Sequence, residues 1–295
     1  MTKVVRGLLL VFLSGTVLPA VLSSSPGNSP PEPTVTGILG AFAEETRVLK
    51  VATADKDVRT ISGIEFVSGK LEGRRVVIAG TGVGKVNAAV VAALLLAHFH
   101  PNEVIFTGIA GAVDKALRPG DIVIGEKLAQ HDLGHVGPRG FRAESVENPI
   151  DRRRNPLFFP SDPALVGLAR RAASELVLEE VDAKVGRRTP KVLTGIIVTG
   201  DVFVASRRTK AFLKKEFDAD AVEMEGAAVA QVCFQQKVPF LVLRSMSDSA
   251  DENAGLDIGR FYQKAAANSA ALTRSLLRQL AKRDGAQTME RLEGQ

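Results

Sequence analysis

Short apolar runs alternate with longer amphipathic segments along most of the chain. Short runs rich in β-branched residues predict strands at residues 35–41, 64–67, 75–79, 103–106, 121–124, 192–198, 220–222 and 240–243. Longer segments with apolar residues on one face predict helices at residues 44–53, 84–99, 163–176, 207–216, from 226 onward, and 258–283. Repeated strand–helix units favour one α/β domain with a largely parallel sheet.

Both ends of the chain depart from this alternation. Residues 1–22 combine two basic residues with an apolar run shorter than a comfortable membrane span, which predicts an export signal; an uncleaved membrane anchor is the alternative. Residues 23–33 are rich in Pro and Ser, typical of a linker. We expect a folded domain at 34–283, a frayed polar tail at 284–295, and an exported, periplasmic protein without stable membrane association after cleavage.

Composition narrows the class of protein. The chain has 295 residues, 45% hydrophobic and 24% charged, which is normal for a globular protein with a full core. Its net charge of +5 comes from scattered basic pairs, with no tryptophan and one tyrosine, so the sequence does not predict a nucleic-acid-binding surface. The single cysteine, Cys233, excludes an intramolecular disulfide, and we expect a buried inert thiol.

The histidines and one long segment do not by themselves predict a functional site. His98, His100, His131 and His135 do not form a metal-ligand set, and no metal or organic cofactor is expected. His131 follows a strand and could lie near a site, although a surface loop is the simpler interpretation. Residues 130–160 look irregular and too long for a plain connection, so they should be functional or disordered.

Acidic and small polar residues follow two predicted strands. Glu223 and Glu225 come after the first, and Arg244, Ser247 and Asp248 come after the second. In α/β sheets ligands bind outside the carboxyl ends of strands, so these residues are candidate site walls. The alternative is that the two glutamates are ordinary acids favoured at a helix N-terminus.

Two glycine-rich turns also follow strands. Residues 80–85 (Gly-Thr-Gly-Val-Gly-Lys) open a helix but match neither the P-loop nor the dinucleotide-binding spacing. Residues 107–111 (Thr-Gly-Ile-Ala-Gly) have the same small-residue character. Such turns let a ligand approach the backbone, and with the acidic strand ends they predict one crevice.

Seven motifs, taken together in order, resemble one family: Gly37-Ile-Leu-Gly-Ala-Phe-Ala-Glu-Glu45, Gly80-Thr-Gly-Val-Gly-Lys-Val86, Thr107-Gly-Ile-Ala-Gly111, Pro119-Gly-Asp-Ile-Val123, Gly200-Asp-Val-Phe203, Val222-Glu-Met-Glu225 and Ser247-Asp248. The chain from about residue 35 to 280 is similar to the purine nucleoside phosphorylase/uridine phosphorylase superfamily, above all to its 5′-methylthioadenosine/S-adenosylhomocysteine nucleosidases. The resemblance implies a three-layer α/β/α sandwich around a mixed, twisted sheet, and a homodimer in which a neighbour's loop closes the site.

The resemblance also implies a reaction and roles. The reaction is hydrolysis of the N-glycosidic bond of a small-molecule adenine nucleoside, through an oxocarbenium-like transition state. Asp248 would protonate N7 of adenine, Ser247 would orient Asp248, and Glu45 would activate the water. Around the sugar, the resemblance implies Glu225 at the ribose hydroxyls, Met224 beneath the ribose and Arg244 near the water. Around the base, it implies Phe203 stacked on the adenine ring and the Val204 backbone at the purine edge. It places Val83 and Ile258 along the substrate tail, and the remaining wall would contain Glu223, Ile109, Ala110 and Gly111.

Alternatives remain at this stage. Asp248 could cap the following turn, and Glu44 and Glu45 could be helix-start acids. A phosphorylase would need cationic clamps for phosphate, which the first glycine region lacks, and Glu45 would repel the anion. Ile109 replaces the serine of the bacterial nucleosidases, and an export signal is unusual for intracellular thioether metabolism. A phosphorylase, a futalosine-type hydrolase and a secreted nucleoside-binding or storage protein without turnover therefore stay as alternatives.

Overall fold

The computed structural model describes residues 34–138, 140–182 and 187–293. The expected signal at 1–22 and linker at 23–33 lie outside the described residues. Among the described residues no helix is both long and apolar enough to cross a membrane.

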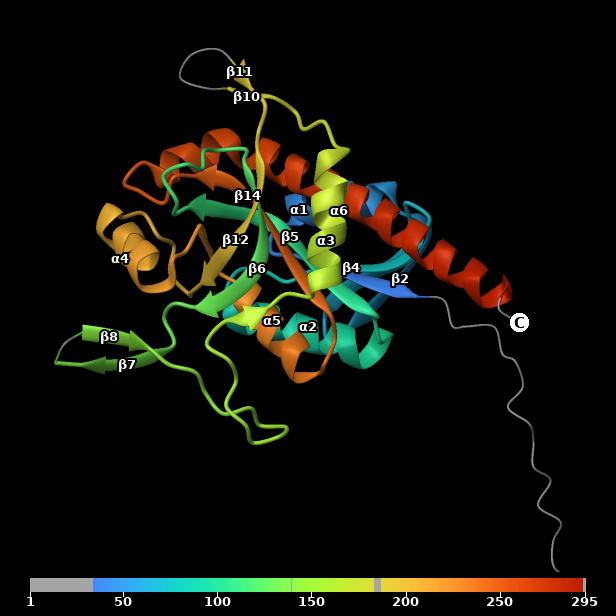
Figure 1. The fold of residues 1–295 in the computed structure, drawn as a ribbon, viewed down its shortest axis with the longest axis horizontal. Helices are drawn as coiled ribbons and strands as arrows, with labels where there is room; N and C mark the ends of the chain where they lie inside the picture. The colour runs from blue at the N-terminus through green and yellow to red at the C-terminus, as the bar shows by residue number, and fades with distance from the viewer. Residues whose placement is uncertain (1–33, 139, 183–186, 294–295) are drawn as a thin grey trace, which may run out of the picture. The chain divides into compact units, whose positions relative to one another are not determined.

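A ten-stranded sheet forms the middle of the described domain (Figure 1). Its main path runs β13-β12-β6-β14-β5-β1-β4-β3-β2, with β9 paired to β6. Because β13 also pairs with β5, the strands β13, β12, β6, β14 and β5 close on themselves. The bounds are β1 (Val35–Gly40), β2 (Ala54–Ile61), β3 (Ile64–Leu71), β4 (Arg74–Gly80), β5 (Glu103–Ala112), β6 (Ile122–Gln130), β9 (Phe159–Pro160), β12 (Val192–Thr199), β13 (Ala221–Glu223) and β14 (Phe240–Asp248).

The sheet is mixed, as the family resemblance implied, and not largely parallel as the strand–helix alternation predicted. β5 pairs in parallel with β1 and β14, whereas β14 pairs antiparallel with β6, and β2, β3 and β4 form an antiparallel meander. β2 was not predicted, because nearly all its side chains are exposed and the strand therefore carries no apolar run.

Helices cover both faces of the sheet (Figure 1). One apolar core contains α2 (Lys85–Phe99) and α5 (Gly226–Gln235), and the other contains α1 (Ala43–Ala52), α3 (Pro163–Ser174) and α6 (Ala254–Glu293). These two cores with the sheet between them make the three-layer α/β/α sandwich. A further helix, α4 (Arg207–Phe217), packs in a third cluster beside β12 and β13. Cys233 is fully buried in the first core, as expected, and burial raises the pKa of its thiol to about 12.

Two expectations about irregular segments are corrected. The predicted tail at 284–295 is helical as far as Glu293, because α6 continues past Arg283. Asp284 accepts hydrogen bonds from Thr34 and from the buried Arg74, which ties this part of α6 to the sheet. The 130–160 region, expected to be irregular, contains regular structure: the hairpin β7 (Gly134–Gly137)–β8 (Gly140–Ala143) and then β9. A second hairpin is formed by β10 (Val181–Asp182) and β11 (Arg187–Arg188).

Candidate active site

Two central strands run further than the apolar pattern predicted, and their extensions carry the candidate residues. β14 continues through Asp248, and β5 continues through Ala112. The register pairs Arg244 with Gly108 and Asp248 with Gly111, so the polar end of one strand faces the glycines of the other. Both strands are buried throughout. Polar side chains therefore need partners here, because a buried polar group without one is costly.

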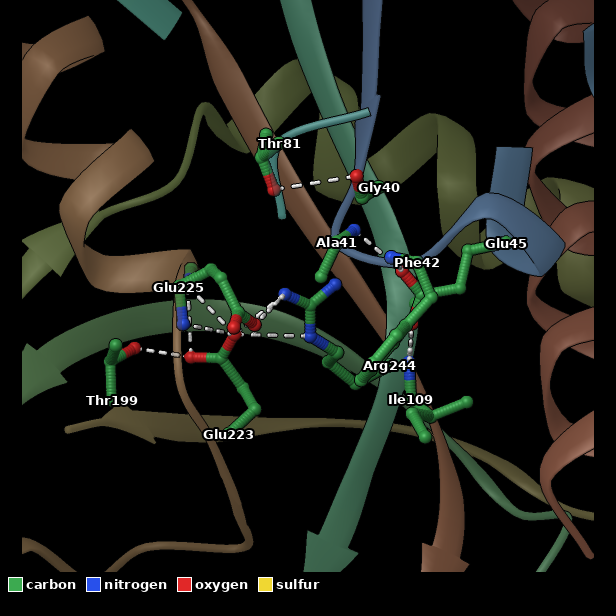
Figure 2. A network of polar contacts seen from close by, with 12 residues as sticks. Gly40, Ala41, Phe42, Glu45, Thr81, Ile109, Thr199, Glu223, Glu225 and Arg244 are labelled. Atoms are coloured by element: carbon green, nitrogen blue, oxygen red, sulfur yellow. Dashed lines mark hydrogen bonds and ion pairs between the residues drawn. The ribbon is translucent and has the colours of Figure 1, made fainter. Parts of the chain in front are cut away.

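Arg244 lies at the centre of that polar cluster (Figure 2). Its side chain is 1% exposed and donates to Glu223 from Nε at 3.2 Å and from Nη2 at 2.6 Å. The guanidinium carbon also lies 4.2 Å from the centre of the Phe106 ring. Burial alone would lower the pKa of Arg244, but Glu223, Glu45 and Glu225 together raise it. The guanidinium therefore stays charged as the counter-ion of three acids.

Glu223 anchors Arg244 and the start of α5. Its carboxylate accepts from the Thr199 hydroxyl, from the Gly226 amide at 2.7 Å and from the Glu225 amide at 3.1 Å, besides Arg244. The alternative interpretation, an acid at a helix N-terminus, therefore holds for Glu223, which accepts from amides at the start of α5. The residue lines the pocket, yet its oxygens already have several protein donors.

Glu45 is held by backbone amides from two parts of the chain. Its Oε2 accepts from Ala41 at 2.6 Å and Phe42 at 2.9 Å, and its Oε1 accepts from the Ile109 amide at 3.0 Å. The first two bonds are the expected capping of α1, whereas the third joins α1 to β5. Burial raises the pKa of Glu45, although Arg244 and these amides oppose that shift. Its neighbour Glu44 is exposed.

Glu225 lies on the pocket side of the cluster. It accepts from the Gly84 amide at 2.9 Å, at the N-terminal end of α2, and one oxygen is 3.8 Å from Arg244 Nη2. Burial, followed by repulsion from Glu223, raises the pKa of Glu225 to about 7. The charge of this carboxyl therefore depends on pH close to neutrality.

The raised pKa of Glu225 predicts a pH-dependent stability. From pH 4.5, the ordinary value, up to about 7, the folded protein holds a proton that the unfolded chain releases. The free energy of unfolding therefore falls as pH rises through this window. Glu225→Gln has no carboxyl to titrate at this position. We therefore expect the free energy of unfolding of the variant, minus that of the natural protein, to increase as pH rises. Urea unfolding at about pH 5 and about pH 8 measures this; a pH-independent difference would contradict it.

Asp248 has one partner on each carboxylate oxygen. The Ser247 hydroxyl donates to Oδ2 at 2.7 Å, and the Ala250 amide donates to Oδ1 at 2.8 Å. The contact with Ala250 is the turn cap that the sequence analysis gave as an alternative. Asp248 therefore caps this turn and also faces the pocket. Burial raises the pKa of Asp248, while Ser247 and Ala250 partly offset the shift.

An open pocket adjoins these residues, and the space between its walls, open solvent included, is about 410 Å³. Eleven predicted site residues line it, with two further residues, Phe42 and Val222: Val83, Ile109, Ala110, Gly111, Phe203, Glu223, Met224, Glu225, Ser247, Asp248 and Ile258. Val204 lines a smaller adjoining hollow with Phe203. Glu45 and Arg244 are buried rather than part of the lining.

Two aromatic residues near the pocket were missed by sequence reasoning. Phe42 is 37% exposed and meets Tyr262 edge-to-face, with 5.6 Å between ring centres. The Tyr262 hydroxyl donates to Glu44 at 2.8 Å. Tyr262 also packs with Ile109 and Ile258, so the wall around Ile109 is apolar. Two features of the sequence could have indicated them. Phe42 lies three residues before Glu45, and Tyr262 lies one helical turn after Ile258.

His131 is not on a surface loop, which corrects the simpler interpretation. It is 7% exposed, and its amide donates to the Thr199 carbonyl at 2.8 Å. Gly200 makes room for the ring, since a Cβ there would lie 2.4 Å from the imidazole. Burial lowers the pKa of His131. The residue therefore packs behind the wall that carries Phe203.

Gly108 should not tolerate a side chain. A Cβ there would lie 2.6 Å from Glu45 Oε1 and 2.8 Å from Arg244 Nη1, and both groups are held by other contacts. We expect Gly108→Ala to lower the free energy of unfolding by about 1–3 kcal/mol, as overpacking usually does. Urea unfolding measures it. Gly167→Ala on α3, where a Cβ would meet nothing within 4 Å, is the control and should not destabilise; equal effects would contradict the argument.

Comparison with known proteins agrees with this geometry. Residues 35–278 match the model of the phosphorylase superfamily. A 5′-methylthioadenosine/S-adenosylhomocysteine nucleosidase of Shewanella loihica is 39% identical over 245 residues, which are 83% of this chain and 99% of that protein. The Neisseria meningitidis nucleosidase of the same name, solved with methylthio-immucillin-A, superposes with a TM-score of 0.72 at 36% identity, covering 83% of this chain and 99% of that one. The futalosine hydrolase of Helicobacter pylori gives a TM-score of 0.70 at 33% identity, covering 83% and 97%.

The fold and the comparisons define an α/β protein with a nucleoside phosphorylase-like fold, and the chain belongs to the phosphorylase superfamily. Within that superfamily its similarity is to the 5′-methylthioadenosine/S-adenosylhomocysteine nucleosidases, with a futalosine hydrolase also a structural neighbour.

Proposed function

We propose that this protein hydrolyses the N-glycosidic bond of adenine nucleosides of the 5′-methylthioadenosine and S-adenosylhomocysteine type, releasing adenine. The similarity to nucleosidases supports this class of reaction. The observation that carries the proposal is the placement of two buried acids along β5. Glu45 meets this strand at Gly108 and Ile109, whereas Asp248 meets it at Gly111. Two to three strand residues span roughly 7–10 Å, which leaves room for a sugar and a water between the acids.

Each acid has the environment its role needs. Asp248 would donate a proton to N7 of the purine, because burial raises its pKa, and Ser247 fixes its orientation at 2.7 Å. Glu45 would accept a proton from the attacking water. Glu225 would accept hydrogen bonds from the ribose hydroxyls, and its negative charge would favour the cationic sugar ring.

Arg244 could help to hold that water. Its Nη1 is buried and has no hydrogen-bond partner among the described residues. Nη1 and Glu45 Oε1 both lie within 3 Å of the position that a Cβ on Gly108 would take, so the two groups lie close together beside the Gly108 backbone. A water bound next to both groups could donate to Glu45 and accept from Arg244. The exposed ring of Phe203 would stack on adenine, and the Val204 backbone would read the purine edge.

The pocket favours water over phosphate as the nucleophile. Among the described residues, its lining contains three carboxylates, Glu223, Glu225 and Asp248, and no lysine or arginine. A phosphorylase must bind a dianion, for which cationic or amide clamps are the usual solution. The amides near Glu45 are already used by its own carboxylate.

The experiment is release of free base by the purified protein. The assay would compare five substrates with and without phosphate: methylthioadenosine, S-adenosylhomocysteine, adenosine, inosine and a futalosine-type nucleoside. We expect phosphate-independent adenine release. Release of ribose-1-phosphate that depends on added phosphate would show a phosphorylase, and preference for the futalosine-type substrate would show the other hydrolase. Nucleoside binding without turnover would overturn the enzyme proposal in favour of a binding protein.

We further propose that the protein is exported after loss of residues 1–22 and that it is a homodimer. The basic-then-apolar start of the chain supports export, and the family resemblance supports the dimer. N-terminal sequencing of protein from the periplasmic fraction tests the first proposal, and sedimentation equilibrium tests the second. An intact N-terminus in the membrane fraction would show an uncleaved anchor.

A further inference from the structure

The turn that follows Asp248 is held from outside the pocket by α4. Ala250 is fully buried in one apolar cluster with Leu213 and Phe217 of that helix. Its φ of 49° is left-handed, which a non-glycine residue adopts at a cost, so packing must hold the turn in place. The same Ala250 amide donates to Asp248 Oδ1 at 2.8 Å. The position of the turn therefore sets the position of the carboxylate.

Lys210 is the polar link between α4 and that turn. Its ammonium donates to the Ser249 carbonyl at 2.7 Å, and this carbonyl belongs to the residue between Asp248 and Ala250. Charge-assisted hydrogen bonds of this kind are stronger than neutral ones. Arg207 adds a second contact, 3.0 Å from Glu252, but both of those side chains are mainly exposed and such pairs contribute little.

The Lys210 ammonium also carries charge close to the acid. Asp251, Asp248 and Asp114 are the carboxylates that interact with it, and its side chain is half-buried. Asp248 in turn faces the negative charges of Asp257 and Asp251, which raise its pKa. The Lys210 cation opposes the effect of these two charges, because a nearby positive charge favours the ionised form of a carboxylate. Lys210 thus acts on Asp248 through both the turn and its charge.

We propose that Lys210 is a positioning residue for Asp248: it holds the Ser249–Ala250 turn, and so the acid, in the orientation that faces the pocket. This inference rests on the proposed function, in which Asp248 protonates the leaving base. Lys210 does not line the pocket, so it acts without touching the substrate. Ser247 orients the acid from the neighbouring residue, whereas Lys210 acts from a different helix.

The test compares Lys210→Met, Lys210→Arg and Lys215→Met. Lys215 lies on the same helix with a side chain 81% exposed, and it is the control. We expect Lys210→Met to lower kcat for adenine release about tenfold with little change in KM, since misplacing a reacting group by a fraction of an ångström is costly. Lys210→Arg, which keeps the charge and a donor, should recover most of the loss.

A second readout separates positioning from simple destabilisation and does not need turnover. Removing the cation should raise the pKa of Asp248, measured by NMR titration of ¹³C-labelled aspartate carboxyls, with Asp248 assigned from the Asp248→Asn spectrum. Lys210→Arg and Lys215→Met should leave the pKa of Asp248 unchanged. In Lys210→Met, the alkaline limb of the kcat–pH profile should shift to higher pH, following the raised pKa of Asp248.

The outcomes are distinguishable. Unchanged kcat and an unchanged Asp248 pKa in Lys210→Met would overturn the role of Lys210 while leaving the proposed function intact. Absence of base release by the natural protein would instead overturn the proposed function, and the NMR titration would still decide whether Lys210 acts on Asp248.

Discussion

Asp248→Asn is expected to lower kcat for adenine release by about 10²–10⁴-fold, the usual contribution of a positioned general acid. Asparagine has almost the same shape as aspartate and can still accept from Ala250, so the turn should persist. It cannot supply the proton that the leaving adenine needs. KM should therefore change little, because the pocket walls stay in place. Steady-state kinetics with methylthioadenosine measures the effect.

The matched control for this change is Asp182→Asn, an exposed aspartate at the hairpin β10–β11. It should keep the natural kcat. Circular dichroism should show the same fold for both variants. If Asp248→Asn retained most of its activity, the acid would have to be another group, and the assignment of Asp248 would be wrong.

Arg244→Met should be the most destabilising single change in the site. It leaves Glu223 in the protein interior without its guanidinium partner, and Glu45 and Glu225 without their shared counter-ion. Breaking a buried ion pair by removing one partner typically costs about 3–5 kcal/mol. Urea unfolding at neutral pH measures the loss. Methionine is of similar length and apolar, so lost volume is a small part of it.

Arg278→Met provides the contrast. Arg278 pairs with Glu72 at 3.0 Å, but its side chain is 45% exposed, and exposed pairs contribute about 0–1 kcal/mol. In the site, the double variant Arg244→Met/Glu223→Gln should recover part of the stability lost by Arg244→Met alone, because it removes one stranded charge. Equal losses for Arg244→Met and Arg278→Met would show that the central guanidinium is not the counter-ion of the cluster.

Part of the candidate site could be predicted from local sequence. Ser247 and Asp248 are adjacent, so their 2.7 Å contact needs only a strand end. The two capping bonds of Glu45 follow equally from its position three residues after Phe42. The family resemblance also placed Phe203, Met224 and Ile258 at one pocket, since a family pattern includes the long-range arrangement of its residues.

Other features depended on contacts between distant residues. Glu45 accepts from Ile109, 64 positions away, and nothing near either residue indicates that bond. The resemblance placed Arg244 near the water, but its pairing with Glu223 follows from how β13 and β14 meet β5. Tyr262 meets Phe42 only because α6 packs beside α1 in the folded chain.

The sequence by itself determined the order of most strands and helices, the α/β class and the acids at the strand ends, because periodicity, helix capping and adjacency are local properties. The tertiary structure decided the mixed sheet, the exposed strand β2, the full length of α6 and the burial of His131. It also decided which acid serves the fold and which faces the pocket. Those outcomes depend on strand register and on the low dielectric of the assembled interior, which shifts the pKa values of Glu225 and Asp248 only after distant segments have packed together.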